Sequence, residues 1–579
     1  MPLRALGETG PQAFELSVSS GVYRIGPEAL LPIPDLLHPE PSLWLAVAEL
    51  RQVLTFAFAS GVGSDAFERA LAKTKAPPTT LVPECFAKDL FVDDFVARCL
   101  PLRKGPRSTK ERRQALAALL TLPPGDADTI ALRHAVLAEL IAKPACRAGL
   151  ESALSALGEL FGMLEGVPRA KDPANTFRRV EILRAVRQAF DTVAESVPGA
   201  TSALARLAAF GSAVRASDAY RHLLELLDHE GNLATVDVRL RLARDGHVRA
   251  FEILRASENT QNRYYGGPVR RFFMRLRLLF RGYRVGEDEL LGRLLQTVFD
   301  GIEEPLLALF QVRRDIEFYL AALGLRDFAA SKGLPVCLPE VAFPSDPNAP
   351  LPDSRFESLY NPLLLLEESP PRPTDLRIGG RSQLIVTGPN SGGKTRLLQA
   401  VGLAQLLAQA GFFVPARSAA LAARPGLFVS VVEEATADAR EGRLGTELLR
   451  IRKLFEGLAW GSLVIVDELC SGTNPSEAEE IFALVLRELS ALEPQTIVTT
   501  HFLHFAAGLA SDRNLPYLEF LQVELDATQT PTFGFVQGVA TTSLARRTAE
   551  RLGVTREALK GLVDEAQRRR QASASIPGR

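Results

Sequence analysis

The sequence predicts a multidomain protein in which a mainly α-helical lever and core region is followed by an α/β domain. A chain of 579 residues is too long for one hydrophobic core and suggests roughly three to five domains. Apolar residues recur at helical spacing through the middle of the chain. The last third alternates short apolar runs with amphipathic segments, which is the order expected for parallel strands joined by helices.

Charge and cysteine usage narrow the class of protein. The chain has 67 Lys and Arg against 68 Asp and Glu, so a polyanionic partner would have to meet a local patch. Five cysteines without CxxC spacing favour reduced thiols over disulfides or a zinc site. The first twenty residues lack an apolar signal core, and no run reaches 18 apolar residues. We therefore expect a cytoplasmic protein with no transmembrane segment.

The first two expected regions differ in their sequence patterns. Residues 1–105 mix short β-like runs with proline-rich turns, and the sequence indicates no role for them. Residues 106–345 read as the helical core and lever region, in segments such as ERRQALAALLTL, TIALRHAVLAELIA and RRVEILRAVRQAFDTVAESV. Long helices with charged outer faces predict extended levers.

A clamp-like insertion is expected within this helical region, at about 234–286. Its first part alternates apolar and polar residues around Asp245-Gly246, the pair that a type I′ turn requires, and so predicts a β-hairpin. The part between Asn259 and Gly286 contains no acidic residue. It contains seven arginines: Arg263, Arg270, Arg271, Arg275, Arg277, Arg281 and Arg284.

These arginines suggest contact with DNA. Arginine can hold phosphates without reading bases, and Tyr264 and Tyr265 could stack on exposed bases. The DNA candidates are Arg263, Arg270, Arg271, Arg275 and Arg277. Two other interpretations stay open. The segment could be an amphipathic helix with solvated arginines, or a helix lying on an anionic membrane surface.

The α/β domain is expected over 357–555, after a linker rich in proline and acid, PSDPNAPLPDSRF, near 344–356. Apolar runs QLIVT, LFVSVVE, LVIVDE and QTIVTTH alternate with helical segments, which predicts a parallel sheet covered on both faces. Two more β-like runs follow, YLEFLQVEL and TFGFVQG. Residues 556–579 are expected to form a C-terminal helix and a polar tail.

A phosphate-binding loop follows the first of these strands. The run from Gly388 to Thr395 fits GxxxxGK[ST], between an apolar strand and a helix. Its backbone N–H groups can wrap phosphates, its lysine can reach the outer phosphates and its threonine can coordinate magnesium. The expected nucleotide-binding residues are Gly388, Pro389, Asn390, Ser391, Gly392, Gly393, Lys394 and Thr395.

Acidic and imidazole groups end two later strands, LVIVDE and QTIVTTH. Asp467 suits the magnesium shell together with Thr395, and Glu468 suits polarising the attacking water. His501 ends the next strand, where its ring could donate to the γ-phosphate. Glu468 and His501 are therefore the expected catalytic residues, with ATP and Mg²⁺ as the cofactors.

These motifs together resemble the ATPase of the MutS family, a P-loop ATPase domain of the ABC/MutS type. The resemblance lies in TGPNSGGKT, GFFVPA, VDELCSGTNPSEAEEI, TTH and TFGFVQGVATTSLARRTAERLGV. The run DELCSGTNPSE is closer to the second bacterial MutS branch than to the mismatch-repair form. The resemblance is strong over 357–555 and covers the helical region only by layout.

The resemblance implies a homodimer whose two ATPase sites close and move the helical levers around DNA. Ser471, Gly472 and Thr473 would shape the loop that crosses to the partner subunit, and Thr446 alone stands where the family presents a Ser-Thr pair. Asn361-Pro362 replaces the family's His-Pro pair. The Phe-x-Glu motif of mismatch readers does not occur in the sequence, and we expect no C-terminal nuclease domain.

The sequence therefore predicts an ATP-hydrolysing DNA-binding protein that acts on mismatched or branched DNA. The alternative is an ABC-type ATPase that remodels a protein or membrane partner without binding DNA. A transporter ATPase is disfavoured because LSGGQ does not precede the Asp467-Glu468 strand.

Overall fold

The computed structural model divides into two compact units. The first comprises Met1–Pro78, Leu100–Leu119 and Asp128–Gly324, and the second comprises Thr79–Cys99, Leu120–Ala127 and Leu325–Arg579. Within them the structure describes residues 22–25, 31–46, 79–100, 109–164, 174–231, 234–242, 248–258, 287–344, 351–431, 442–469, 474–511, 515, 517–542 and 553–574.

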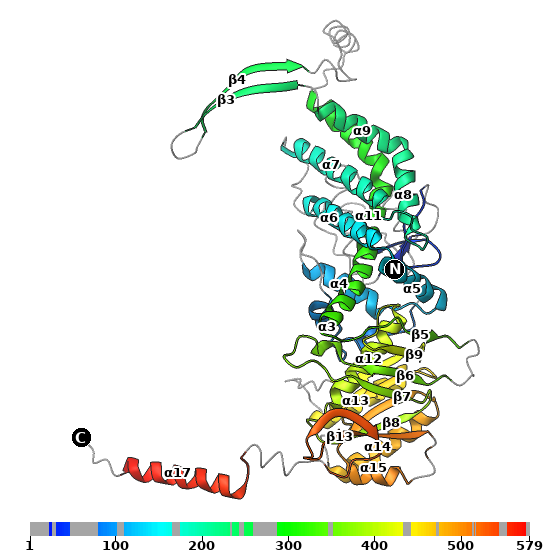
Figure 1. Ribbon diagram of the computed structural model, residues 1–579, viewed down its shortest axis with the longest axis vertical. Coiled ribbons are helices and arrows are strands. Elements are labelled where there is room, and N and C mark those ends of the chain that lie inside the picture. Colours follow the sequence, from blue (N-terminus) through cyan, green and yellow to red (C-terminus); the bar gives the residue numbers. More distant parts are fainter. Residues whose placement is uncertain are drawn as a thin grey trace, which may run out of the picture. The chain divides into compact units, whose positions relative to one another are not determined.

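The first unit is mainly helical, as predicted (Figure 1). Its helices are α4 (Thr109–Thr121), α5 (Ala127–Ala142), α6 (Pro144–Leu164), α7 (Ala174–Glu195), α8 (Ala205–Ala216), α9 (Asp218–Gly231) and α11 (Glu287–Ser331); α4, α5 and α11 also give residues to the second unit. Phe190 of α7 packs edge-on against Phe210 of α8 and Tyr220 of α9. The apolar stripes predicted from the sequence thus meet in one core.

A short N-terminal segment, residues 31–46, is fastened to α11 by buried polar groups. The Leu36 N–H donates to Asp315, and the Tyr319 hydroxyl donates to the Leu36 carbonyl over 2.5 Å. Asp35 is fully buried and accepts from the Leu37 and Ser42 N–H groups. The segment ends in β2 (Leu43–Ala46), which pairs antiparallel with β1 (Val22–Ile25). The polar contacts satisfy backbone groups that burial would otherwise leave unpaired.

The predicted β-hairpin is present. Strand β3 (Ala234–Leu242) pairs antiparallel with β4 (Val248–Glu258). The expected turn at Asp245-Gly246 and the basic segment 259–286 lie outside the described residues.

The second unit contains the predicted α/β sheet. Its six strands are β8 (Gln383–Thr387), β10 (Leu427–Ser430), β11 (Leu463–Val466), β12 (Gln495–Thr500), β13 (Leu518–Leu525) and β14 (Pro531–Gln537). Their order is β10-β11-β12-β8-β13-β14, and all pairs are parallel except β13 with β14. The central strands are buried along their length, which explains their continuous apolar runs.

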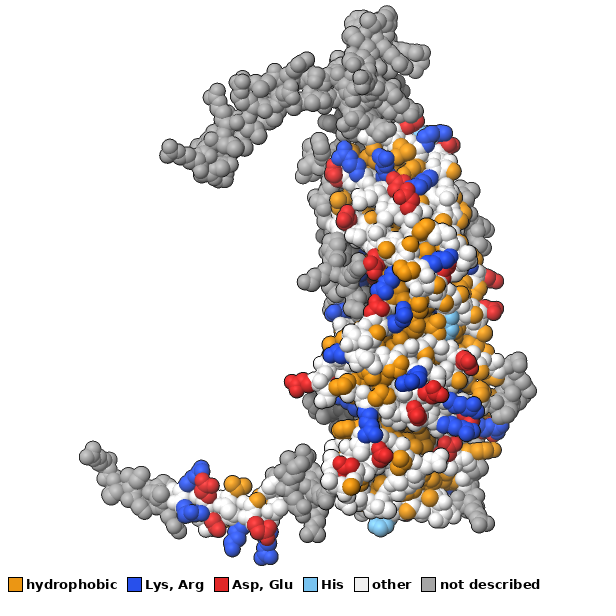
Figure 2. All heavy atoms as spheres, viewed as in Figure 1, with side chains coloured by type: hydrophobic (Ala, Val, Ile, Leu, Met, Phe, Trp, Pro, Cys, Tyr) orange, Lys and Arg blue, Asp and Glu red, His pale blue; other side chains and the backbone are white. Residues whose placement is uncertain are grey.

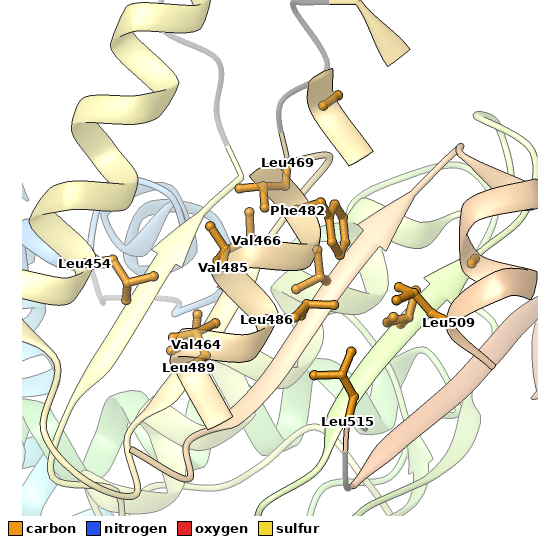
Figure 3. Close-up of a cluster of buried hydrophobic side chains, with 14 residues drawn as sticks. Leu454, Val464, Val466, Leu469, Phe482, Val485, Leu486, Leu489, Leu509 and Leu515 are labelled. Carbon is orange, nitrogen blue, oxygen red and sulfur yellow. The ribbon is translucent and has the colours of Figure 1, made fainter. Parts of the chain in front are cut away.

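Helices of this unit join and cover the strands. They are α12 (Lys394–Gln409), α13 (Gly442–Gly457), α14 (Pro475–Ser490) and α15 (Leu503–Leu509). Helix α17 (Arg556–Ala574) follows the last strand, and its described side chains are largely exposed. Figure 3 shows Phe482, Val485 and Leu489 of α14 in one buried cluster with Val464 and Val466 of β11. Leu454 of α13 joins the same buried cluster. Helix α12 is buried almost throughout, because it contacts the six-stranded sheet and also β5 (Glu340–Ala342).

A second sheet was not indicated by the sequence. Strand β5 pairs with β9 (Ser418–Ala422), which pairs in turn with β6 (Ser354–Leu359), and β6 pairs with β7 (Thr374–Ile378). The residues expected to end the linker therefore lie in β6. The alternation in SRFESL is too short to separate a strand from a loop by pattern alone.

The segment 79–99 groups with the second unit, although the sequence suggested no link to it. It contains η1 (Pro83–Cys85) and α3 (Val92–Cys99). The Val431 N–H, just after β10, donates to Asp89 over 2.8 Å. The Cys99 thiol donates to the carbonyl of Pro362, which begins η2 (Pro362–Leu364).

Positive and negative side chains are interspersed on the described surface seen in Figure 2, as the near-zero net charge predicts. Among the described residues, no helix combines the length and the apolar character needed to cross a membrane.

Candidate functional site

The loop between β8 and α12 can form only with glycines at defined positions. Gly388 has φ 135° and Gly393 has φ 88°, values that disfavour residues with a Cβ. A Cβ added at Gly388 or at Gly392 would lie 2.7 Å from a methyl carbon of Val523 on β13. The loop backbone therefore lies close against β13, and helix α12 begins directly after it at Lys394.

Lys394 is buried beneath this loop. Its side chain Nζ donates to the carbonyls of Gly388 over 2.9 Å and of Pro389 over 3.2 Å. Burial lowers the pKa of Lys394, and the carboxylates of Glu468 and Asp467 act in the opposite direction. The ammonium group is thus held by the curled loop on the side of the two acids. Asn390 and Ser391, at the outer part of the loop, are exposed to solvent.

Thr395, Asp467 and Thr499 form a hydrogen-bonded chain across three elements. The Thr395 hydroxyl donates to one oxygen of Asp467, and the Thr499 hydroxyl donates to the other. Strands β11 and β12 are parallel neighbours, so their carboxyl ends bring Asp467 and Thr499 to the same edge of the sheet. Both Asp467 oxygens are therefore fixed in direction beside the start of α12.

Glu468 and His501 complete the cluster. Glu468 has φ 53°, in the left-handed region, and its N–H donates to the Thr499 hydroxyl over 3.0 Å. The Nδ1 atom of His501 lies 3.8 Å from a Glu468 oxygen. The His501 ring lies 4.3 Å, centroid to centroid, from Phe502. A non-glycine residue in this backbone region is strained, which is frequent where a side chain must point at a ligand.

Other residues support this site through contacts that the sequence did not show. Asn361 is buried, accepts from the Leu363 N–H, and donates to the Arg396 carbonyl and the Gln399 side chain, both on α12. Thr499 lies in the TTH run, but only the position of β12 beside β11 shows that its hydroxyl orients Asp467. Val523 supports the loop glycines from a strand 130 residues later in the chain.

Several predicted site residues cannot be placed around this cluster. Ser471, Gly472 and Thr473 lie outside the described residues, as do Arg263, Arg270, Arg271, Arg275 and Arg277. The backbone of Thr446 lies in the first turns of α13.

The donor set suits a magnesium–nucleotide complex better than a metal held by the protein alone. Among the described residues, no group of three or more His, Cys, Asp or Glu side chains could hold a metal ion. Thr395 and Asp467 offer two hard oxygen ligands side by side. Magnesium is usually bound by one or two such groups together with substrate phosphates and water, so these residues fit it.

Comparison with known proteins agrees with this geometry. Residues 384–568 match the family model of MutS domain V. Endonuclease MutS2 of Thermomicrobium roseum is 30% identical over 313 residues, which are 50% of this chain and 38% of that protein. Endonuclease MutS2 of Thermus thermophilus is 36% identical over 180 residues, 31% of this chain and 24% of that protein.

The matches thus span less than two-fifths of the length of these relatives. The family-model match includes the loop from Gly388 to Thr395, the Asp467-Glu468 pair and His501. Residues 384–568 are thus similar to domain V of the MutS family, and the matched part of the chain is similar to proteins of the MutS2 branch.

Proposed function

We propose that this chain is a homodimeric, ATP-hydrolysing protein of the MutS type that acts on mismatched or branched DNA. The observation that carries the proposal is the convergence of Lys394, Thr395 and the Asp467-Glu468 pair at the carboxyl ends of β8 and β11, the two strands that flank β12. The match to MutS domain V and the names of the relatives support the coarser part, an ATPase that acts on DNA.

Each residue of the cluster has a role in this proposal. Lys394 exchanges its two loop carbonyls for the outer phosphates of ATP, where its charge is stabilised far better than by neutral dipoles. Thr395 and Asp467 hold Mg²⁺, which neutralises charge on the phosphates. Glu468 polarises the attacking water, and His501 donates to the γ-phosphate. The Thr499 hydroxyl keeps Asp467 oriented.

ATP binding, rather than hydrolysis, is the proposed switch. Two nucleotides enclosed between two chains close the ATPase domains, and Thr446, Ser471, Gly472 and Thr473 face the opposite nucleotide. Moving such a dimer from 1:99 to 99:1 closed requires about 5.5 kcal/mol of differential binding. Two magnesium–triphosphate groups can supply this through charge-assisted hydrogen bonds.

Two variants test the nucleotide roles. Lys394→Ala should weaken ATP binding by about 100-fold or more, because it removes the only charge proposed to lie beneath the loop. Glu468→Gln should keep ATP binding and abolish turnover, so that an ATP-bound dimer accumulates. Titration calorimetry and light scattering measure the two effects. Lys560→Ala is the matched control, because Lys560 is exposed on α17. An equal loss of ATP binding in both site variants would contradict these roles.

A salt series tests the DNA role. Binding to homoduplex, mismatched and four-way DNA is measured with and without Mg-ATP. If all seven arginines of 259–286 contacted phosphates, the log-log slope would approach roughly −6. The double variant Arg270→Glu and Arg271→Glu should lose affinity for every DNA to a similar extent. An ATPase rate that ignores all three DNAs, with no measurable binding, would favour the alternative ATPase that remodels a protein or membrane partner.

A further inference from the structure

An acidic side chain from residues 79–99 binds the end of an outer strand of the six-stranded sheet. Strand β10 pairs with β11 only, and at its end the Ser430 carbonyl accepts from the Asp467 N–H over 2.8 Å. The N–H of the next residue, Val431, donates to Asp89 over 2.8 Å. Because successive peptide groups of a strand face opposite sides, the Asp89 carboxylate takes the place of a neighbouring strand on the open side of β10.

A tight turn presents Asp89 to this strand end. The Phe91 N–H donates to the Lys88 carbonyl and the Val92 N–H donates to the Ala87 carbonyl, each over 3.0 Å. This pair of hydrogen bonds is the Schellman motif, which ends a helical turn. Phe91 has φ 53° and occupies the left-handed position that glycine usually takes in the motif. Such strain persists only where the surrounding structure holds the backbone in place.

Leu90 anchors the same turn within the α/β unit, and its side chain is fully buried. A Cβ added at Gly402 of α12 would lie 2.5 Å from the Cδ2 atom of Leu90 and 3.2 Å from the Cδ1 atom of Ile465 on β11. Leu90 therefore fills a space between α12 and β11 that depends on glycine at position 402. Thr395 lies at the start of α12 and Asp467 directly follows β11. The turn thus contacts both elements that carry the proposed magnesium ligands.

We propose that Asp89 is a positioning residue for ATP hydrolysis. It holds the end of β10, and the hydrogen bond between Ser430 and Asp467 then keeps the metal-binding carboxylate aligned with the phosphate-binding loop. The inference rests on the proposed function and names a residue that controls turnover at the same site. Because the partner of Asp89 is a neutral backbone N–H, the role requires an acceptor oxygen rather than a charge.

Removing the acceptor tests the role. In Asp89→Ala, turnover at saturating Mg-ATP should fall by about tenfold, because a small misplacement of a metal ligand slows the chemical step. The Mg²⁺ concentration that gives half of the maximal rate should rise as well. Affinity for metal-free ATP should be unchanged, since the loop and Lys394 are intact. Steady-state kinetics and calorimetry on the full chain measure these quantities.

Two further variants at acidic positions serve as controls. Asp89→Asn keeps an acceptor oxygen at the same place and should restore both turnover and the Mg²⁺ requirement. Asp94→Ala removes an exposed carboxylate from the same segment and should behave as wild type. Thermal unfolding of each variant is measured in parallel.

A variant on α12 keeps the proposal testable if Asp89→Ala does not fold. Gly402→Ala places a Cβ against Leu90 and should displace the turn while leaving Asp89 itself unchanged. Turnover should fall and the Mg²⁺ requirement should rise as in Asp89→Ala. Leu90→Ala in the same chain removes the clashing atoms and should restore part of both.

The outcomes distinguish this inference from the proposed function. A lower melting temperature in Asp89→Ala with unchanged turnover and Mg²⁺ requirement would show a purely structural contact and overturn the positioning role. Equal losses in Asp89→Ala and Asp89→Asn would show that the acceptor oxygen is not what matters, and would also overturn it. If the wild-type chain bound no ATP, the proposed nucleotide site itself would be wrong.

Discussion

Two buried charged groups, one in each unit, are satisfied in different ways. Glu317 in the helical unit accepts from Arg112 over 2.7 Å and from Arg313 over 3.1 Å, and all three side chains are buried. Lys394 in the α/β unit is equally buried, yet its ammonium group donates to two neutral carbonyls of its own loop. A buried charge matched by opposite charges is costly to unpair, whereas a charge held by replaceable dipoles is available to a ligand.

Removing Glu317 from its ion pairs with Arg112 and Arg313 should have the largest effect on stability. Glu317→Ala leaves two guanidinium groups buried without their carboxylate, so the helical unit should lose about 3 to 5 kcal/mol of its free energy of unfolding. Denaturant titration measures the loss. Replacing all three residues by apolar residues of similar volume should cost far less. If Glu317→Ala lowered the free energy of unfolding by less than about 1 kcal/mol, the pairing of Glu317 would not differ in this way from that of Lys394.

A second matched carboxylate, Glu139, predicts a pH dependence. Burial would raise its pKa, but hydrogen bonds from Lys143, Ser202 and Thr201 outweigh burial and lower the pKa to about 2. Because the folded pKa is depressed, the stabilisation is complete above the unfolded value near 4.5 and is lost as the pH falls toward 2.

Glu139→Gln should therefore lower the free energy of unfolding by about 2 to 3 kcal/mol at pH 7 and by almost nothing near pH 2. The free energies of unfolding of wild type and variant are measured at pH 7, 4 and 2.5, and the difference between them should decrease as the pH falls. A gap that stays constant over this range would show that the carboxylate charge does not stabilise the unit.

Substitutions in the phosphate-binding loop should lower ATP affinity to a smaller extent, and a second substitution should reverse part of the loss. Gly392→Ala places a Cβ 2.7 Å from Val523, so ATP affinity should fall by about tenfold while the overall stability changes little. Val523→Ala in the same chain should restore part of the affinity, because it removes the clashing methyl groups. The same second change should not rescue Gly388→Ala, since Gly388 also needs φ 135°. Calorimetry with ATP measures Gly392→Ala and Gly388→Ala, each with and without Val523→Ala.

The smallest effect on ATP affinity is expected at Asn361, which lies behind the loop. Asn361→Ala removes two donated hydrogen bonds to α12 and one accepted from Leu363, at a cost of about 1 to 2 kcal/mol in the stability of the α/β unit. ATP affinity should fall by only about twofold, because the residue contacts α12 from behind. Thermal unfolding and calorimetry test this. A loss of affinity without a loss of stability would place Asn361 in the site itself.

The local sequence pattern determined much of this protein. Helical periodicity predicted the helical unit, and apolar runs predicted the strands that carry the loop and Asp467. Glycine spacing predicted the phosphate loop, because a left-handed backbone and close approach to β13 both require glycine there. These signals are local, so they can be read without knowing which segments meet.

Tertiary structure decided the remainder. The four-stranded sheet, the place of residues 79–99 in the α/β unit, and the contacts of Asn361 and Val523 each join segments far apart in the chain. A short strand or a single polar residue carries no local pattern that names its distant partner. Only the folded chain brings such partners within hydrogen-bond or van der Waals distance, and there packing rather than propensity determines their role.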